Sequence, residues 1–111
     1  MPSRPARLLC AGKDMGLLNT RCAVLWRSGY VAHPAALSEA EDLARTEEFD
    51  LIIVSAWLSE RETNRILEAA GETPALVLTE MTSADELLAR VERLLAPAHF
   101  KPFLVSRTDL A

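Results

Sequence analysis

Two hydrophobic patterns alternate along the chain. Short apolar runs, typical of parallel strands that are buried on both faces, predict strands at 7–11, 30–33, 50–55, 74–79 and 99–101. Apolar residues at helical spacing lie between these runs and predict helices at 16–28, 38–47, 59–70 and 83–96.

Glycine, proline and serine mark the expected boundaries of these elements. Gly29 follows the first predicted helix, as a residue that ends a helix in the left-handed conformation does, and Pro34 is expected to end the second strand. Three Ser-x-x-Glu capping boxes, at Ser38, Ser59 and Ser83, are expected to begin the next three helices.

Strands that alternate strictly with helices predict an α/β fold in which helices cover both faces of a parallel sheet. Five strands in 111 residues fit a flavodoxin-like, three-layer sandwich with a five-stranded sheet of order 2-1-3-4-5, formed by residues 1–111 as a single domain. Function in such sheets is concentrated at the carboxyl ends of the strands.

Composition narrows the classes of function that the chain can have. Half of the residues are apolar, a quarter are charged, and the formal net charge of −4 argues against a nucleic-acid surface. The apolar stretch 51–58 is far shorter than the roughly 20 residues of a membrane helix. No signal peptide is recognised, so a cytoplasmic location is expected.

Cys10 and Cys22 are expected to be free thiols rather than a disulfide framework or a metal site.

No constellation of residues predicts an enzyme. Ser55 follows the clearest strand but lacks a neighbouring base and a nucleophile-elbow motif. Gly12 and Gly16 form neither a phosphate-binding Walker loop nor a dinucleotide-binding fingerprint.

Several segments occur in the order and register of a known family. The stretches SGYVAHPAALSEAEDLA, FDLIIVSAWLS, PALVLTE and HFKPF follow one another along the chain. Together they resemble a response-regulator receiver domain, and the resemblance extends from Arg7 to Phe103. It implies a signalling module of two-component systems, of bacterial type.

The resemblance also implies that the phosphorylation site is degenerate. Receivers accept a phosphoryl group on an aspartate at the position of Ser55, and hold Mg²⁺ with an acidic pair at the positions of Gly12 and Lys13. Mg²⁺ prefers oxygen ligands, and Asp14 lies one step out of register. We therefore expect a pseudo-receiver that uses neither Mg²⁺ nor aspartyl phosphorylation, and we expect no cofactor.

Two further positions match receiver residues that contact the phosphoryl group, namely Thr79 and Lys101. Without nearby carboxylates, Lys13 and Lys101 would make this edge electropositive. Asp14 is then expected to turn toward one of the lysines, or an anion to bind among Lys13, Thr79 and Lys101. Trp57 either fills the emptied site or faces a partner.

The resemblance places a fifth helix beside the first, but only residues 103–111 remain for it here, so this helix is expected to be short or missing. The sheet would then expose Leu76, Leu78 and Phe100 as an apolar patch, which favours a homodimer. The candidate interface residues are Trp57, Phe100, Phe103 and Leu104.

The sequence therefore favours a receiver-like regulatory module that acts through protein–protein contact. The alternative is a domain that senses a small anion or a nucleotide with the strand-end pocket around Lys13 and Lys101.

Overall fold

The computed structural model describes residues 5–79 and 82–95. Strands and helices alternate along these residues, as the hydrophobic pattern predicts. They are β1 (Arg7–Gly12), α1 (Met15–Arg27), β2 (Val31–Ala36), α2 (Leu37–Thr46), β3 (Leu51–Val54), α3 (Glu60–Ala70), β4 (Ala75–Val77) and α4 (Ala84–Leu95). None of the helices in these residues has the length and hydrophobicity of a membrane span.

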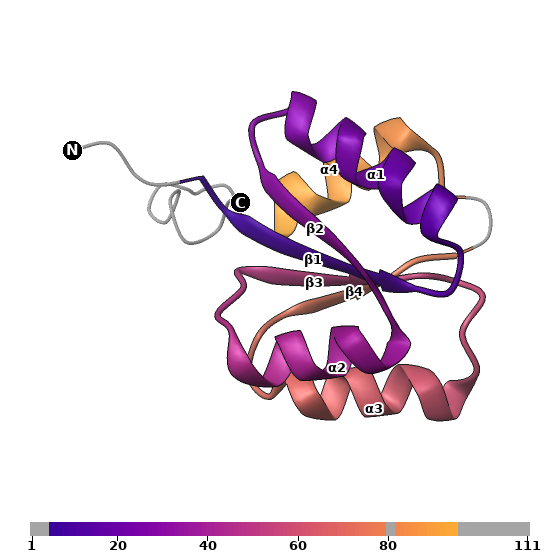
Figure 1. The fold of residues 1–111 in the computed structure, drawn as a ribbon. Coiled ribbons are helices and arrows are strands. Elements are labelled where there is room, and N and C mark those ends of the chain that lie inside the picture. Colours follow the sequence, from indigo (N-terminus) through magenta and orange to yellow (C-terminus); the bar gives the residue numbers. More distant parts are fainter. Residues whose placement is uncertain (1–4, 80–81, 96–111) are drawn as a thin grey trace, which may run out of the picture.

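The strands form one parallel sheet with the order β2-β1-β3-β4 (Figure 1). The α/β class and the first four positions of the expected strand order are confirmed. The sheet in the described residues has four strands rather than five, because the strand expected at 99–101 lies outside them.

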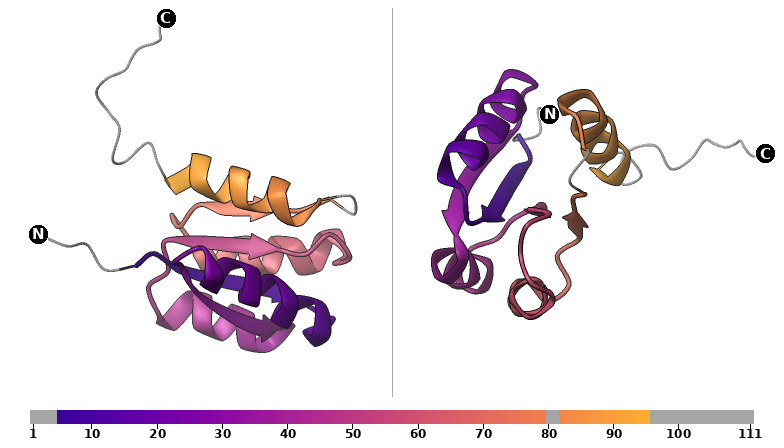
Figure 2. Two further views of the ribbon diagram at one scale, coloured as in Figure 1. Left: turned by 90° about the horizontal axis from the view of Figure 1, so that it is seen from above. Right: turned by 90° about the vertical axis from the view of Figure 1, so that its right-hand side faces the viewer.

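Helices cover both faces of the sheet, which gives three layers (Figures 1 and 2). Alternate strand residues point to opposite faces. Leu8 and Cys10 of β1 pack in one apolar cluster with α1 and α4. Leu9 and Ala11 pack in a second cluster with α2 and α3. Cys10 and Cys22 are buried free thiols in the first cluster, as expected.

Helix α4 lies beside α1, where the receiver resemblance places the fifth helix (Figure 1). Leu76 and Leu78 are buried in the cluster that α4 covers. The expected exposure of these two leucines, and of the sheet face around them, is therefore wrong. The position beside α1 that a short or missing fifth helix would leave open is filled by α4.

The face of the sheet that α4 covers also restricts where the expected fifth strand could join the sheet. The connections β2–α2–β3 and β3–α3–β4 run in one direction across the sheet with their helices on the opposite face from α4. A right-handed connection to a parallel strand beyond β4 would have to pass over that same opposite face. A strand reached from α4 at that edge would therefore require the rare left-handed connection.

Two boundaries differ from the prediction. Pro34 lies inside β2, which continues to Ala36. Val31 donates its N–H to Ala6 O, just before β1, so Pro34, three residues on, has its nitrogen on the side facing away from β1. Because β2 is an edge strand of the described sheet, the missing N–H of Pro34 costs no ladder hydrogen bond.

The second difference is the start of α2. This helix begins at Leu37 with Ala36 at its N-cap and no side-chain cap, so Ser38 is not a capping residue. The capping box at Ser59 is confirmed. Ser59 Oγ accepts from the Glu62 N–H, and the Ser59 N–H donates to Glu62 Oε1. Ser83 Oγ likewise accepts from the Glu86 N–H.

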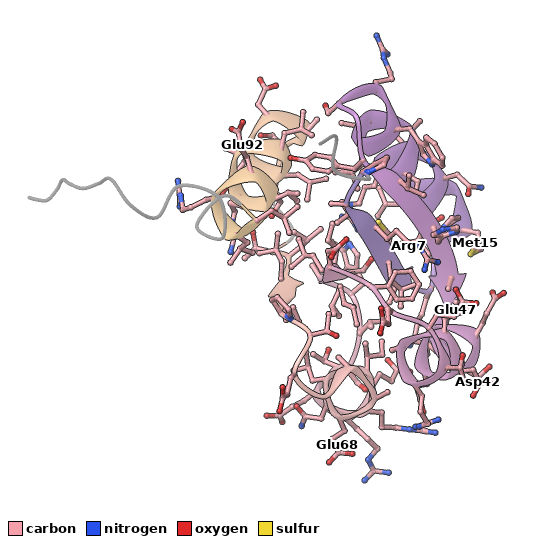
Figure 3. The ribbon with its side chains drawn as sticks, turned by 90° about the vertical axis from the view of Figure 1, so that its left-hand side faces the viewer. Arg7, Met15, Asp42, Glu47, Glu68 and Glu92 are labelled. Atoms are coloured by element: carbon pink, nitrogen blue, oxygen red, sulfur yellow. The ribbon has the colours of Figure 1, made fainter. Side chains whose placement is uncertain are left out.

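Arg7 connects the start of β1 to the segment before β3 (Figure 3). Its guanidinium pairs with Glu47 at 2.9 Å and lies 4.9 Å from the centre of the Phe49 ring. Its backbone N–H donates to Asp50 Oδ2 at 2.7 Å. This cluster lies at the amino end of β1, the opposite end of the strand from Gly12.

Candidate functional site

Ser55 and Gly12 meet where β3 and β1 end. Ser55 is 5 % exposed, and its N–H donates to Ala11 O at 2.9 Å. A Cβ added to Gly12 would lie 2.9 Å from Ser55 Cβ, would overlap Ser55 Oγ, and would lie 3.2 Å from Leu18 Cδ2. The serine side chain thus takes the space that any side chain at position 12 would need, and a carboxylate there would require Ser55 to move.

The cation at this site comes from α1. Arg21 Nη1 donates to Ser55 Oγ at 2.9 Å. Burial lowers the pKa of Arg21, but a guanidinium keeps its charge at neutral pH. Sequence reasoning missed Arg21, although the sequence carries a signal for it. Arg21 is a charged residue among the apolar positions Leu18, Cys22 and Leu25, with which α1 packs on the sheet.

Lys13 and Asp14 are each engaged with a different partner from the one expected. Lys13 Nζ lies 3.1 Å from Glu62 Oε2 of α3. Hydrogen bonding from the Ser59 N–H, reinforced by Lys13, lowers the pKa of Glu62 below the ordinary carboxyl value. Asp14 caps α1, with Oδ1 accepting from the Leu17 N–H at 3.1 Å. Among the described residues Asp14 forms no ion pair with Lys13, so the expected turn toward that lysine is wrong, whereas Lys101 lies outside these residues.

Thr79 follows β4, the strand next to β3, but its side chain is part of a local turn. Its N–H donates to Thr82 Oγ1, and the two hydroxyl oxygens lie 3.1 Å apart. Thr79 is exposed. The other residues expected at this edge or at an interface, Lys101, Phe100, Phe103 and Leu104, lie outside the described residues.

Trp57 does not fill the site, because it is 63 % exposed. Of the two roles considered for it, filling the emptied site is wrong and contact with a partner stays a prediction. The space around Ser55 is occupied instead by the Arg21 side chain, which the sequence did not place there.

The residues around Ser55 do not fit the Mg²⁺ that receiver chemistry uses. Gly12 supplies no ligand, and Arg21 and Lys13 are cations. Asp14, the acid nearest to Gly12 and Lys13 in the sequence, already accepts a hydrogen bond as the cap of α1. Within residues 5–79 and 82–95, no three His, Cys, Asp or Glu side chains gather as metal ligands would.

Solved structures with a similar fold include receiver domains. A response regulator receiver protein from Sinorhizobium medicae WSM419 is similar with a TM-score of 0.64 and 13 % identity, over 82 % of this chain and 94 % of that one. The receiver domain of a signal transduction histidine kinase from Syntrophus aciditrophicus has a TM-score of 0.60 and 16 % identity, over 92 % and 98 % of the two chains.

A third structure is also similar in sequence. The non-phosphorylated HemR receiver domain from Leptospira biflexa has 30 % identity and a TM-score of 0.55, over 78 % of this chain and 74 % of that chain. No protein-family model and no curated protein matches the sequence. The chain therefore has the receiver-type, flavodoxin-like fold, and these neighbours support a signalling module.

Proposed function

We propose that the protein is a pseudo-receiver: a regulatory protein-interaction module, of the kind found in bacterial two-component signalling, that does not undergo aspartyl phosphorylation. The observation that carries this proposal is the contact of Ser55 with Gly12 and Arg21 at the carboxyl end of the sheet. The proposal assigns no catalytic activity to the chain and includes a cytoplasmic location.

The chemistry of phosphoryl transfer supports this reading. Aspartyl phosphorylation needs a carboxylate nucleophile and a metal ion to neutralise the charge that develops on the phosphoryl oxygens. Ser55 offers a buried hydroxyl that already accepts a hydrogen bond from Arg21. An arginine stays protonated and therefore cannot activate this hydroxyl as a general base.

The test is exposure to small phosphoryl donors. The protein is incubated with acetyl phosphate and Mg²⁺, or with beryllofluoride and Mg²⁺, while intact mass and amide NMR shifts are followed. We expect no adduct and no Mg²⁺-dependent shifts near Ser55, whereas a receiver with its aspartate in place responds under the same conditions. A stable acyl-phosphate adduct would refute the proposal.

A Ser55→Asp variant sharpens this test. It returns a carboxylate to the acceptor position but leaves Gly12 and Lys13 where the acidic pair would be. If the missing acidic pair matters as well as the missing aspartate, this variant also stays inert, because its single new carboxylate faces Arg21 rather than a metal ion. Phosphorylation of Ser55→Asp alone would show that residue 55 is the only barrier.

We further propose that the module associates with a second copy of itself. Support comes from β4, an edge strand of the described sheet, where Val77 is 43 % exposed. Leu94 of α4 is 42 % exposed and lines the same hollow as Val77, together with Arg90 and Arg93. An edge strand with neighbouring apolar side chains favours a contact.

The alternative, a sensor of small anions, draws support from one observation. Lys13 is paired with Glu62, which weakens the expected site between Lys13 and Lys101. Arg21, by contrast, forms no ion pair with any described residue. A guanidinium without an acidic partner favours the binding of an anion. The anion would bind between α1 and α4.

A further inference from the structure

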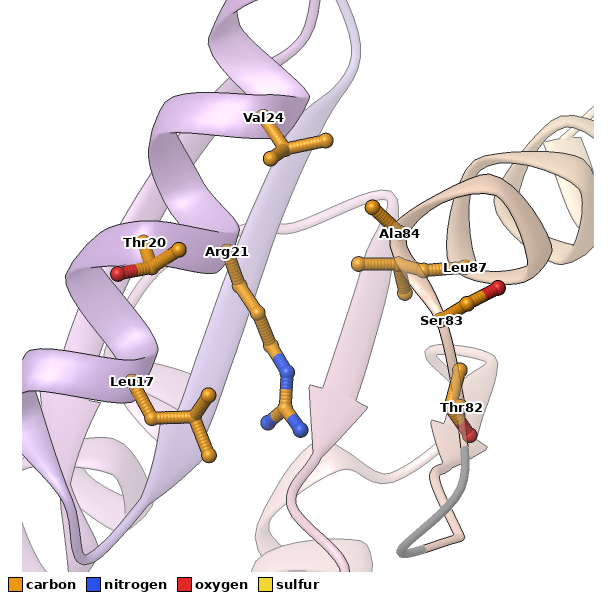
Figure 4. A pocket seen from close by; sticks show the side chains of 8 residues that line it. All are labelled: Leu17, Thr20, Arg21, Val24, Thr82, Ser83, Ala84 and Leu87. Atoms are coloured by element: carbon orange, nitrogen blue, oxygen red, sulfur yellow. The ribbon is translucent and has the colours of Figure 1, made fainter.

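A pocket of about 160 Å³ opens between α1 and α4 (Figure 4). Half of the lining residues come from α1, and the other half come from α4 together with the two residues before it. The lining residues are Leu17, Thr20, Arg21 and Val24 from α1, and Thr82, Ser83, Ala84 and Leu87 from the start of α4 and the residues before it. This pocket is distinct from the receiver-type site, although Arg21 borders both.

Arg21 is the charged group of the pocket. Its side chain extends from α1 into the space between the two helices (Figure 4). One of its five N–H groups donates to Ser55, so most of its hydrogen-bonding capacity remains for another acceptor. Burial already lowers the pKa of Arg21, which means that an anion in the pocket would offset a desolvation cost.

The hydroxyl groups of the pocket differ in what they can offer. Thr20 donates its O–H to Gly16 O at 3.0 Å and is therefore spent as a donor. Ser83 Oγ accepts from the Glu86 N–H, and its O–H donates to no acceptor within residues 5–79 and 82–95. The Ser83 Oγ atom points away from Arg21, toward its own helix (Figure 4), so binding would depend on the donors of Arg21.

The remaining wall is apolar. Leu17 and Val24 lie on the α1 side, and Ala84 and Leu87 lie on the α4 side (Figure 4). An all-polar anion such as phosphate would leave these side chains without contact. An apolar cavity of about 150 Å³ accommodates a molecule of the size of benzene. The pocket therefore combines a cation at one end with room for a small apolar group.

We infer that this pocket binds a small organic carboxylate, with the carboxylate on Arg21 and a compact apolar part between α1 and α4. Arginine can hold a carboxylate through two parallel hydrogen bonds, which favours this group over a neutral polar one. Such a ligand would join α1 to α4 and bring its charge next to Ser55. The inference does not depend on whether Ser55 is phosphorylated.

Benzoate is a suitable probe, followed by amide NMR shifts on the full chain. We expect saturable shifts confined to residues 17–24 and 82–87, and binding at least about tenfold weaker for benzamide, which has the same shape without the charge. Inorganic phosphate is also expected to bind more weakly than benzoate. Equal binding of benzamide, or no saturation up to millimolar benzoate, would overturn the inference without needing any variant.

Variants then identify the cation. Arg21→Gln should weaken benzoate binding about tenfold or more, whereas Arg27→Gln, on the last turn of the same helix, should leave it unchanged. Equal effects of both variants would indicate general charge attraction and overturn the inference. A Glu80→Gln variant tests whether the carboxylate two residues before Thr82 in the sequence competes with the probe. If benzoate binds only to Glu80→Gln, the pocket is not a ligand site in the native protein.

Discussion

At the scale of single residues, the departures from the receiver pattern support one another. Gly12 has no room for a side chain because Ser55 lies against it, and Ser55 is held by Arg21. A substitution at any one of these three positions therefore disturbs the other two. The three residues form a packed arrangement of their own, which supports the proposal that this is a degenerate site and not a receiver site with one residue lost.

Gly12→Ala should destabilise the protein by about 1–3 kcal/mol, the usual cost of overpacking a core. The added Cβ would lie 2.9 Å from Ser55 Cβ, closer than two carbon atoms can approach without a shift. Gly16→Ala is the control, because its Cβ would lie 3.4 Å from Asp14 Oδ1, an ordinary contact. It should be neutral or stabilise α1 by up to about 1 kcal/mol. Urea unfolding measures both, and equal effects would contradict the packing argument.

Glu62 should make stability depend on pH in the acid range. Its pKa is lowered in the folded protein by the Ser59 N–H and by Lys13, so its contribution is complete above the ordinary carboxyl pKa of about 4.3. The contribution is lost as the pH falls through the lowered pKa. The difference in unfolding free energy between wild type and Glu62→Gln should therefore shrink toward low pH.

Glu68→Gln is the control for this measurement, since Glu68 lies on the same helix and points into solvent (Figure 3). The Glu62→Gln difference should fall more steeply toward low pH than the difference for this control. A Glu62→Gln difference that falls no more steeply than the control would show that the pairing of Glu62 with Lys13 and Ser59 has no influence on stability.

At the scale of elements, three identical sequence motifs have different outcomes. Ser59 and Ser83 each accept a hydrogen bond from the backbone three residues on, whereas Ser38 lies inside α2 and caps nothing. The strand β2 runs directly into α2, so the chain is already helical at Leu37 when it reaches Ser38. The motif alone cannot reveal where the preceding strand ends.

Alanine substitutions separate these outcomes. Ser59→Ala and Ser83→Ala should each cost about 1 kcal/mol, because each leaves an N–H at a helix start without its acceptor. Ser38→Ala should cost nothing and can stabilise slightly, since alanine is the better helix former. Thermal unfolding of the three variants provides the comparison, and a cost for Ser38→Ala similar to the others would refute the assignment of Ala36 as N-cap.

At the scale of the whole molecule, the arrangement of helices determines which surface is free for a partner. α1 and α4 cover one face of the sheet and α2 and α3 cover the other, so the apolar faces of β1 and β3 are fully enclosed. Among the described residues, the exposed apolar side chains at the β4 edge are Val77 and Leu94, whereas Trp26 lies at the β2 edge, where its Nε1 donates to Ala32 O. The proposed dimer is therefore expected at β4 and α4 rather than on the sheet face.

Sedimentation equilibrium tests this arrangement. Wild type at tens of micromolar should show a mass near twice the 12.2 kDa of one chain. Val77→Lys and Leu94→Lys should shift the mass toward the monomer, because each places a charge in the contact. Met15→Lys, at an exposed apolar residue of α1, should not. A wild-type mass of one chain at every concentration would refute self-association.

The sequence by itself determined the elements and much of the site. Strand and helix periods differ, so the apolar pattern located all eight described elements to within a few residues. The positions of Gly12, Ser55 and Thr79 at strand ends also followed from sequence, because parallel strands end at one edge of the sheet.

Only the tertiary structure decided the side of the sheet for α4 and the partners of the charged residues. An amphipathic pattern shows that a helix has an apolar face, but not which face of a two-sided sheet it covers. Arg21 and Lys13 have long side chains whose partners are chosen among groups brought near by folding, which were Ser55 and Glu62. These contacts join residues that are 34 and 49 positions apart, and no local pattern records them.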